Sequence, residues 1–166
     1  MKWKPVSKED LKWFKSQGFI NSILFGLAMI AVMLPISLII HSHPSYQIQI
    51  RTIPERLIYP IYLIPLLLTG ILFEEMGIRW GPSLILKKLL KERYRLPFLL
   101  LIPAIDAYLH FSNIIKATKF ALGGYWFIHY LLSLMLTYWF LKEGLKGSYI
   151  AHLTYDSTLL ILGAIL

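Results

Sequence analysis

Apolar residues in this chain gather into five long blocks separated by short polar segments, at residues 19–40, 57–86, 96–111, 120–141 and 148–166. These lengths are near or above the roughly 20 residues that a helix needs to cross the hydrocarbon of a bilayer. The blocks lack the period-two alternation of strands, so we expect no β-structure. The pattern predicts an all-α integral membrane protein: a bundle of about five transmembrane helices, forming a single membrane domain over residues 1–166.

Composition and charge support this interpretation. Of the 166 residues, 57% are hydrophobic and 16% charged, which is too apolar for an ordinary soluble domain. The net charge of +8 comes mainly from lysine and arginine before the first block and after the second and fourth blocks. This positive-inside pattern predicts a cytoplasmic N-terminus, with residues 1–18 as a basic cytoplasmic lead-in. The basic residues therefore serve topology and contact with the lipid bilayer, and we expect no nucleic-acid partner.

Two further features narrow the class of protein. The first block has a basic flank but no small-residue cleavage site, so it resembles an uncleaved anchor more than a signal peptide. Cysteine is absent, which excludes disulfides, a thiolate nucleophile and a cysteine-ligated metal. We expect a multi-pass protein of a prokaryotic cytoplasmic membrane.

Several ionisable side chains lie inside the apolar blocks, where an acid at a helix centre costs about 2.5–3.5 kcal/mol on insertion scales. Six of them form pairs spaced four apart, which share one helix face: Glu75 with Arg79, Asp106 with His110, and His152 with Asp156. We expect these three polar stripes to face one another, away from lipid.

Each pair also has a structural interpretation. Glu75 and Arg79 are most simply an ion pair, and the other two pairs alone would suit hydrogen bonding between helices. Glu74 differs, because Ile78 occupies the position four residues on. This freer carboxylate is the candidate general base. His129 stands alone among aromatic and apolar neighbours, and we interpret it as structural.

Three motifs lie in order on separate spans: Glu74-Glu75-x-x-x-Arg79, then a histidine on the next span (His110), then His152-x-x-x-Asp156 on the last span. Together they resemble the motifs of the CPBP family. These are the CAAX-protease and bacteriocin-processing intramembrane proteins, also called Abi. The family's motifs are Glu-Glu-x-x-x-Arg, Phe/Tyr-x-x-x-His and His-x-x-x-Asn/Asp. The resemblance covers residues 74–156, within an expected protease core at residues 70–160. It departs at Asp106, where the family has an aromatic residue, and at Asp156, where its best-understood proteases have asparagine.

The resemblance implies an intramembrane glutamic endopeptidase that acts on a peptide or protein substrate at the membrane. Glu74 with His110 would activate a water, and His152 with Asp156 would stabilise the oxyanion. The supporting residues would be Glu75, Arg79 and Asp106. No cofactor is expected; a zinc-dependent protease using a Glu–His–His set is the second choice.

Alternatives remain open at this point. An ionised Asp156 would repel an oxyanion, which favours a non-catalytic family member such as a bacteriocin self-immunity or scaffold protein. Buried acid and histidine pairs also build proton or ion pathways. For a protease, we expect a cavity open to the cytoplasm, with a tilted or broken helix at Gly77, Gly81 or Pro82.

Overall fold

The computed structural model describes residues 16–50, 60–90, 93 and 95–165. Most of the expected lead-in at residues 1–18 therefore lies outside the described residues. The elements follow in the order α2 (Gln17–His41), β1 (Ile48–Ile50), α3 (Pro60–Glu74), η2 (Glu75–Trp80), α4 (Gly81–Leu90), α5 (Arg95–Leu109), η4 (His110–Asn113), β2 (Ile114–Ala117) and α6 (Lys119–Ile165).

Helices dominate the described chain, and three of them are long and apolar enough to cross a bilayer: Gln17–His41, Arg95–Asn113 and Lys119–Leu162. Large apolar side chains point outward from them, as contact with lipid requires; Ile39, for example, is 72% exposed. The expected class, an all-α membrane protein, is confirmed. The count of five crossings and the side of the N-terminus stay predictions.

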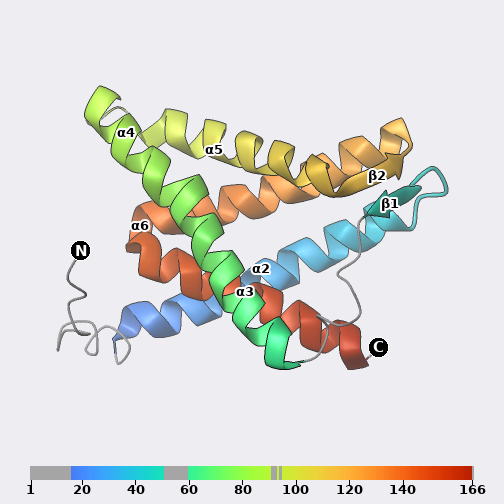
Figure 1. The fold of residues 1–166 in the computed structure, drawn as a ribbon, viewed down its shortest axis with the longest axis horizontal. Coiled ribbons are helices and arrows are strands. Elements are labelled where there is room, and N and C mark those ends of the chain that lie inside the picture. The colour runs from blue at the N-terminus through green and yellow to red at the C-terminus, as the bar shows by residue number, and fades with distance from the viewer. Residues whose placement is uncertain (1–15, 51–59, 91–92, 94, 166) are drawn as a thin grey trace.

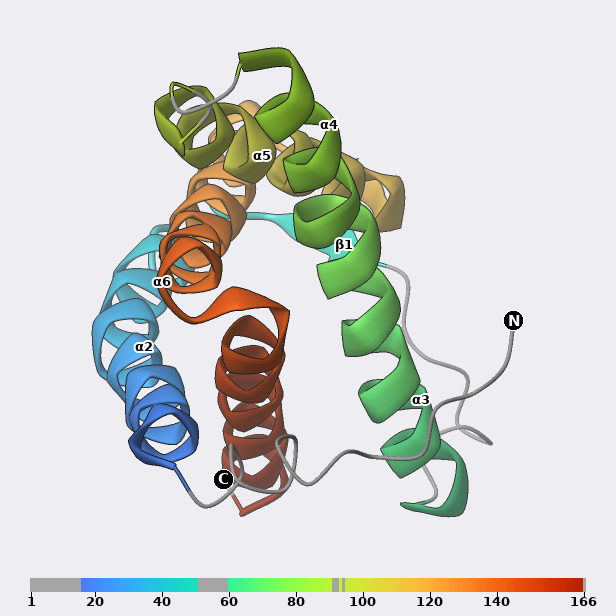
Figure 2. The ribbon, with the colours of Figure 1, turned by 90° about the vertical axis from the view of Figure 1, so that its left-hand side faces the viewer.

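Helix α6 contains a sharp turn at Gly144, where φ is 73° and ψ is −168°. This left-handed φ favours glycine, which has no Cβ to clash. The chain reverses there, so that the two arms of α6, residues 119–143 and 145–165, lie as separate rods in Figure 2. The two arms match the fourth and fifth apolar blocks, and the turn lies within the polar segment between them.

The second apolar block forms one continuous helical rod, α3–η2–α4, in Figure 2. The expected break takes the form of a π-helical segment, in which the N–H of Gly81 donates to the carbonyl of Met76. Pro82 lacks an N–H, and its ring would crowd the carbonyl four residues earlier in an α-helix. The wider π turn relieves this conflict without ending the helix, and π segments of this kind occur often at functional sites.

The first arm of α6 is the centre of the packing. On one side it packs with α2 and the second arm in a cluster that includes Met29, Met33, Leu136 and Tyr155. On the other side Phe140 packs against Phe98 and Ile102 of α5. Helix α3–η2–α4 crosses the other helices obliquely in Figure 1. The arrangement brings η2, the end of α5 and both arms of α6 together.

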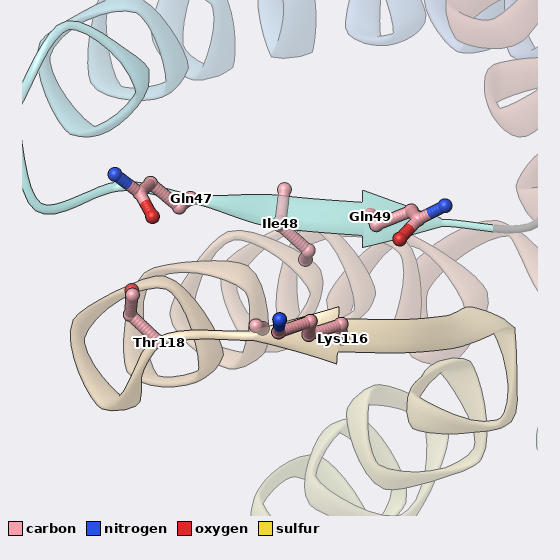
Figure 3. Close-up of a pocket in the computed structure, with 6 residues that line it drawn as sticks. Gln47, Ile48, Gln49, Lys116 and Thr118 are labelled. Atoms are coloured by element: carbon pink, nitrogen blue, oxygen red, sulfur yellow. The ribbon is translucent and has the colours of Figure 1, made fainter.

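The expectation of no β-structure is wrong for two short segments. β1 and β2 pair antiparallel, with Ile48 opposite Ala117 and Gln49 opposite Lys116. A shallow pocket of about 290 Å³ lies along them, and Figure 3 shows the glutamine, lysine and threonine side chains around it. The strands join the two segments that the charge pattern places on the same, external side. Backbone pairing satisfies N–H and C=O groups where the chain leaves the helices.

Candidate active site

A small cavity of about 110 Å³ lies between η2, α5 and the two arms of α6. Every pair of the predicted polar stripes contributes to it. The lining side chains are Glu74, Arg79, Asp106, His110, His129, Leu132, Ser133, Leu136, His152 and Asp156. The expected convergence of polar stripes is confirmed, and Glu75 lies directly behind the cavity through its bonds to Arg79 and His152.

Glu75 is the fully enclosed member of the glutamate pair. Its side chain and that of Arg79 are both 0% exposed, and Arg79 Nη1 lies 2.7 Å from Glu75 Oε1. His152 Nδ1 also donates to Oε1, at 2.8 Å, and Ser148 donates its hydroxyl to Oε2. The predicted ion pair with Arg79 is confirmed. A buried carboxylate with this many donors is held in one geometry, which fits a structural role.

Arg79 also binds a second carboxylate. Its Nη2 donates to Asp106 Oδ2 at 3.0 Å and to Ser133 Oγ at 3.0 Å. Ser133 in turn donates to Asp106 Oδ2 at 2.5 Å. Asp106 is therefore bound mainly to Arg79 and Ser133, while its Oδ1 is 3.5 Å from Nδ1 of His110, the expected partner. An aspartate at the family's aromatic position thus has a physical reason: two carboxylates flank one buried guanidinium.

The ring of His110 is oriented by the main chain and by a second imidazole. Its Nδ1 lies 2.9 Å from the carbonyl oxygen of Asp106. Because a carbonyl only accepts, Nδ1 carries a proton, and Nε2 of the neutral ring is free to accept one. The ring of His129 stacks on that of His110, with centroids 4.2 Å apart. Tyr125 packs on His129 with centroids 4.3 Å apart.

Glu74 faces the cavity and accepts no hydrogen bond from the described residues, in contrast to Glu75. One carboxylate oxygen each from Glu74 and Asp106 and one ring nitrogen of His110 all lie within 4.8 Å of one another. His110, the partner expected for Glu74, lies in this group, and His152 does not. The free carboxylate of Glu74 and the ring of His110 are therefore neighbours.

His152 presents its other nitrogen to the cavity. Since Nδ1 donates to Glu75, Nε2 is directed towards Asp156, whose Oδ2 lies 3.5 Å away. The Asp156 side chain is 32% exposed, against 5% for His152. An ionised Asp156 favours the protonated, donating form of Nε2. With Asp156 ionised, His152 would offer a hydrogen bond from Nε2 at the cavity that Glu74 and His110 also line.

The positions of the possible metal ligands test the zinc alternative. In the described part of the chain, the group with ligand atoms close enough to share an ion is Glu74, Asp106 and His110. It is not the Glu–His–His set that zinc would use in the sequence-based alternative. Asp106 in this group already binds the Arg79 guanidinium, whose positive charge opposes a second cation beside it. The Arg79 guanidinium therefore weighs against a cation at these three ligand atoms.

Sequence reasoning missed three residues of this site: His129, Ser133 and Ser148. His129 was interpreted as structural, but it lines the cavity and stacks on His110. A signal was present, because Ser133 follows His129 by four residues and Ser148 precedes His152 by four. The same four-residue spacing that identified the acid and histidine pairs thus marks these polar residues too.

Comparison with known proteins agrees with the motifs. Residues 56–158 match a family model described as Type II CAAX prenyl endopeptidase Rce1-like. No curated protein and no solved structure matches the chain. The family match covers more than half of the chain and contains all three motifs, so the resemblance to the CAAX-protease family is confirmed. The chain belongs to the Rce1-like family of type II CAAX prenyl endopeptidases.

Proposed function

We propose that this protein is an intramembrane endopeptidase in which Glu74 and His110 activate a water for attack on a peptide bond. The observation that carries the proposal is the convergence of Glu74, His110 and His152, from three separate helical segments, on one cavity of about 110 Å³. Family membership supports a protease that acts on a peptide at the membrane. The geometry supports the glutamate-dependent version of that activity.

The proposed chemical steps use the two groups described above as free to accept a proton, the carboxylate of Glu74 and Nε2 of His110. Glu74, or Nε2 of the adjacent His110, takes a proton from water, and the oxygen of that water forms a bond to the scissile carbonyl carbon. The carbonyl electrons move onto its oxygen, which becomes the oxyanion of a tetrahedral intermediate. As the C–N bond breaks, the protonated group returns its proton to the departing nitrogen. A new carboxylate and a new amine are the products.

Two other groups support these steps. His152 donates from Nε2 to the oxyanion, while its Nδ1 bond to Glu75 holds the ring in place. Asp156 keeps Nε2 protonated but adds a negative charge close to the developing oxyanion. Asp156 is therefore a positioning residue whose benefit depends on its protonation state.

The test is cleavage by purified protein in liposomes. A panel of a farnesylated CAAX peptide, a leader peptide and membrane-spanning peptides is incubated with wild type and with Glu74→Gln, and the products are identified by mass spectrometry. We expect wild type to cleave at least one class and Glu74→Gln to cleave none while remaining folded. A wild type that cleaves nothing, or that only moves protons across the liposome, would favour the non-catalytic or proton-pathway alternatives.

A zinc-dependent protease is the second candidate, because Glu74, Asp106 and His110 offer three ligand atoms within 4.8 Å. Zinc would supply a Lewis acid and a water that is readily deprotonated. Under the metal-free proposal, a chelator leaves cleavage unchanged. Loss of cleavage with a chelator, followed by recovery with added zinc, would replace the proposal with the zinc version.

A further inference from the structure

We propose that the protein binds one anionic phospholipid on the side of α6 opposite the candidate active site, with an acyl chain in an apolar pocket and the phosphate held by Lys142 and Arg95. The pocket has a volume of about 350 Å³ and lies between α2, α5 and the first arm of α6. The side chains that line it are Phe25, Leu99, Leu134, Met135 and Tyr138. This binding is additional to the proposed proteolysis and does not depend on it.

The pocket is separate from the catalytic cavity. Among the described residues, the two spaces share no lining side chain. They use opposite faces of the first arm of α6: Ser133 and Leu136 line the cavity, whereas Leu134 and Tyr138 line the pocket. Successive residues of a helix turn by roughly 100°, which places these two sets on different sides of the arm. A molecule in the pocket therefore lies across the arm from the residues that would activate water.

The lining of the pocket suits a hydrocarbon chain. All of its side chains are aliphatic or aromatic, and Tyr138, at 52% exposed, lies where the pocket meets the surroundings of the protein. All three helices belong to segments that are long and apolar enough to cross a bilayer. An apolar hollow offers water no hydrogen-bond partners, so the acyl chains around such helices are the material that fills it.

A cation lies one helical turn beyond the pocket on each of two helices. Lys142 follows Tyr138 by four residues in α6. Arg95 is the first residue of α5 and precedes Leu99 by four. Residues four apart share a helix face, so each cation lies above a residue that lines the pocket. Both cations are exposed, as a contact with a phosphate requires.

The two helix ends that carry these cations lie side by side. Phe98 of α5 and Phe140 of α6 pack with their ring centroids 5.7 Å apart. The beginnings of α2 and α5 and the turn of α6 all lie at the left of Figure 1. The charge pattern predicts that this is the cytoplasmic side, and basic pockets between helices on that side bind anionic headgroups.

A stack of aromatic rings connects Lys142 to the pocket. Its Nζ lies 4.8 Å from the centroid of the Trp139 ring. Trp139 stacks on Phe25, which lines the pocket, with ring centroids 4.3 Å apart. An ammonium group has three N–H donors, so it can contact the ring and a phosphate at the same time. The ring therefore holds the charge of Lys142 near the pocket.

Native mass spectrometry of the delipidated protein tests the headgroup site. The protein receives equal amounts of phosphatidylglycerol and phosphatidylcholine with identical acyl chains. Each cation near an anionic headgroup contributes about fivefold to binding, so we expect wild type to prefer phosphatidylglycerol by at least about tenfold. Lys142→Gln and Arg95→Gln should each lower that preference by about fivefold.

Lys88→Gln is the matched control for charge. Lys88 is also exposed, and it belongs to α4, which does not line the pocket. This variant should keep the wild-type preference for phosphatidylglycerol. Equal binding of the two lipids by wild type, or the same loss of preference in Lys88→Gln as in Lys142→Gln, would overturn the headgroup site.

Two neighbouring leucines of α5 separate the pocket from the rest of the lipid-facing surface. Leu99 lines the pocket, whereas Leu100 is 49% exposed and lies outside it. The indole of Leu99→Trp would fill the pocket, and we expect it to lower binding of phosphatidylglycerol at least fivefold, while Leu100→Trp leaves binding unchanged. The same loss in both variants would overturn the pocket. A wild-type dimer that Leu99→Trp alone makes monomeric would replace the lipid with a second copy of the chain.

A photo-cross-link in wild type locates the acyl chain without relying on any variant to fold. Phosphatidylglycerol with a diazirine on its acyl chain is irradiated with the protein, and the labelled peptides are identified by mass spectrometry. We expect the label to concentrate on the residues that line the pocket. Label spread equally over outward residues such as Ile39, which is 72% exposed, would show ordinary contact with the bilayer and overturn the proposal.

Discussion

His152 donates its Nδ1 hydrogen bond to Glu75, at 2.8 Å, rather than to the adjacent Glu74. This contact gives the two neighbouring carboxylates different roles. Glu75 is surrounded by the donors Arg79, Ser148 and His152, all of them buried. Glu74 is left facing the cavity beside His110. The pair is therefore one structural acid and one acid that is free for chemistry.

Replacing Glu75 should damage the fold. In Glu75→Gln the buried Arg79 keeps Asp106 as its one acidic partner among the described residues, and His152 loses its charged acceptor. Removing one partner of a buried ion pair costs about 3–5 kcal/mol. We expect a clearly lower unfolding temperature in detergent for Glu75→Gln. The control is Glu143→Gln, which lies outside the cavity; equal unfolding temperatures for the two variants would refute the structural role of Glu75.

Asp106 and Ser133 should act as one unit around Arg79. Both contact its Nη2, and they are also bonded to each other. A double-mutant cycle of Asp106→Ala and Ser133→Ala, followed by denaturant unfolding, should give a coupling of about 0.5–3 kcal/mol. Strictly additive effects would mean that the network does not stabilise the folded protein.

Asp156→Asn should raise the rate of cleavage and change its pH dependence. Asparagine can donate to the oxyanion, whereas an ionised aspartate repels it. Protonation of Asp156 removes the repulsion, so the advantage of the variant should shrink as pH falls and grow as pH rises. The measurement is kcat over a pH series for both proteins. A variant slower than wild type at every pH would assign Asp156 a needed role in keeping His152 protonated.

His129 should position the ring of His110 through the stack between them, whose centroids are 4.2 Å apart. His129→Phe keeps a flat ring there and should retain most of the activity. His129→Ala removes the stack and should lower kcat with little change in KM, because substrate binding does not use it. If His129→Phe is as inactive as His129→Ala while both are folded, the imidazole itself takes part in proton transfer.

Local patterns predicted much of this molecule. The apolar blocks located the helices, and four-residue spacing found the Glu75–Arg79 pair, because both depend on contacts within one helix. The π segment was expected only as a break, since glycine and proline mark irregular backbone without specifying its form.

Contacts between segments that lie far apart in the chain could not be predicted from the sequence. The stack of His110 on His129 depends on how α5 packs against α6. The pairing of β1 with β2 joins two segments that lie far apart in the sequence, although Ile48-Gln49-Ile50 alternates apolar and polar residues. The bond from His152 to Glu75 rather than Glu74 also depends on the rotation of η2 against α6.

The most direct test of the central claim compares cleavage rates for wild type and Glu74→Gln in the same liposomes, together with their unfolding temperatures. Loss of a general base lowers the rate by about 10²–10⁴-fold. We expect a loss of that size in Glu74→Gln with an unchanged unfolding temperature, because Glu74 accepts no hydrogen bond from the described residues. A folded Glu74→Gln protein that cleaves at the wild-type rate would contradict the account.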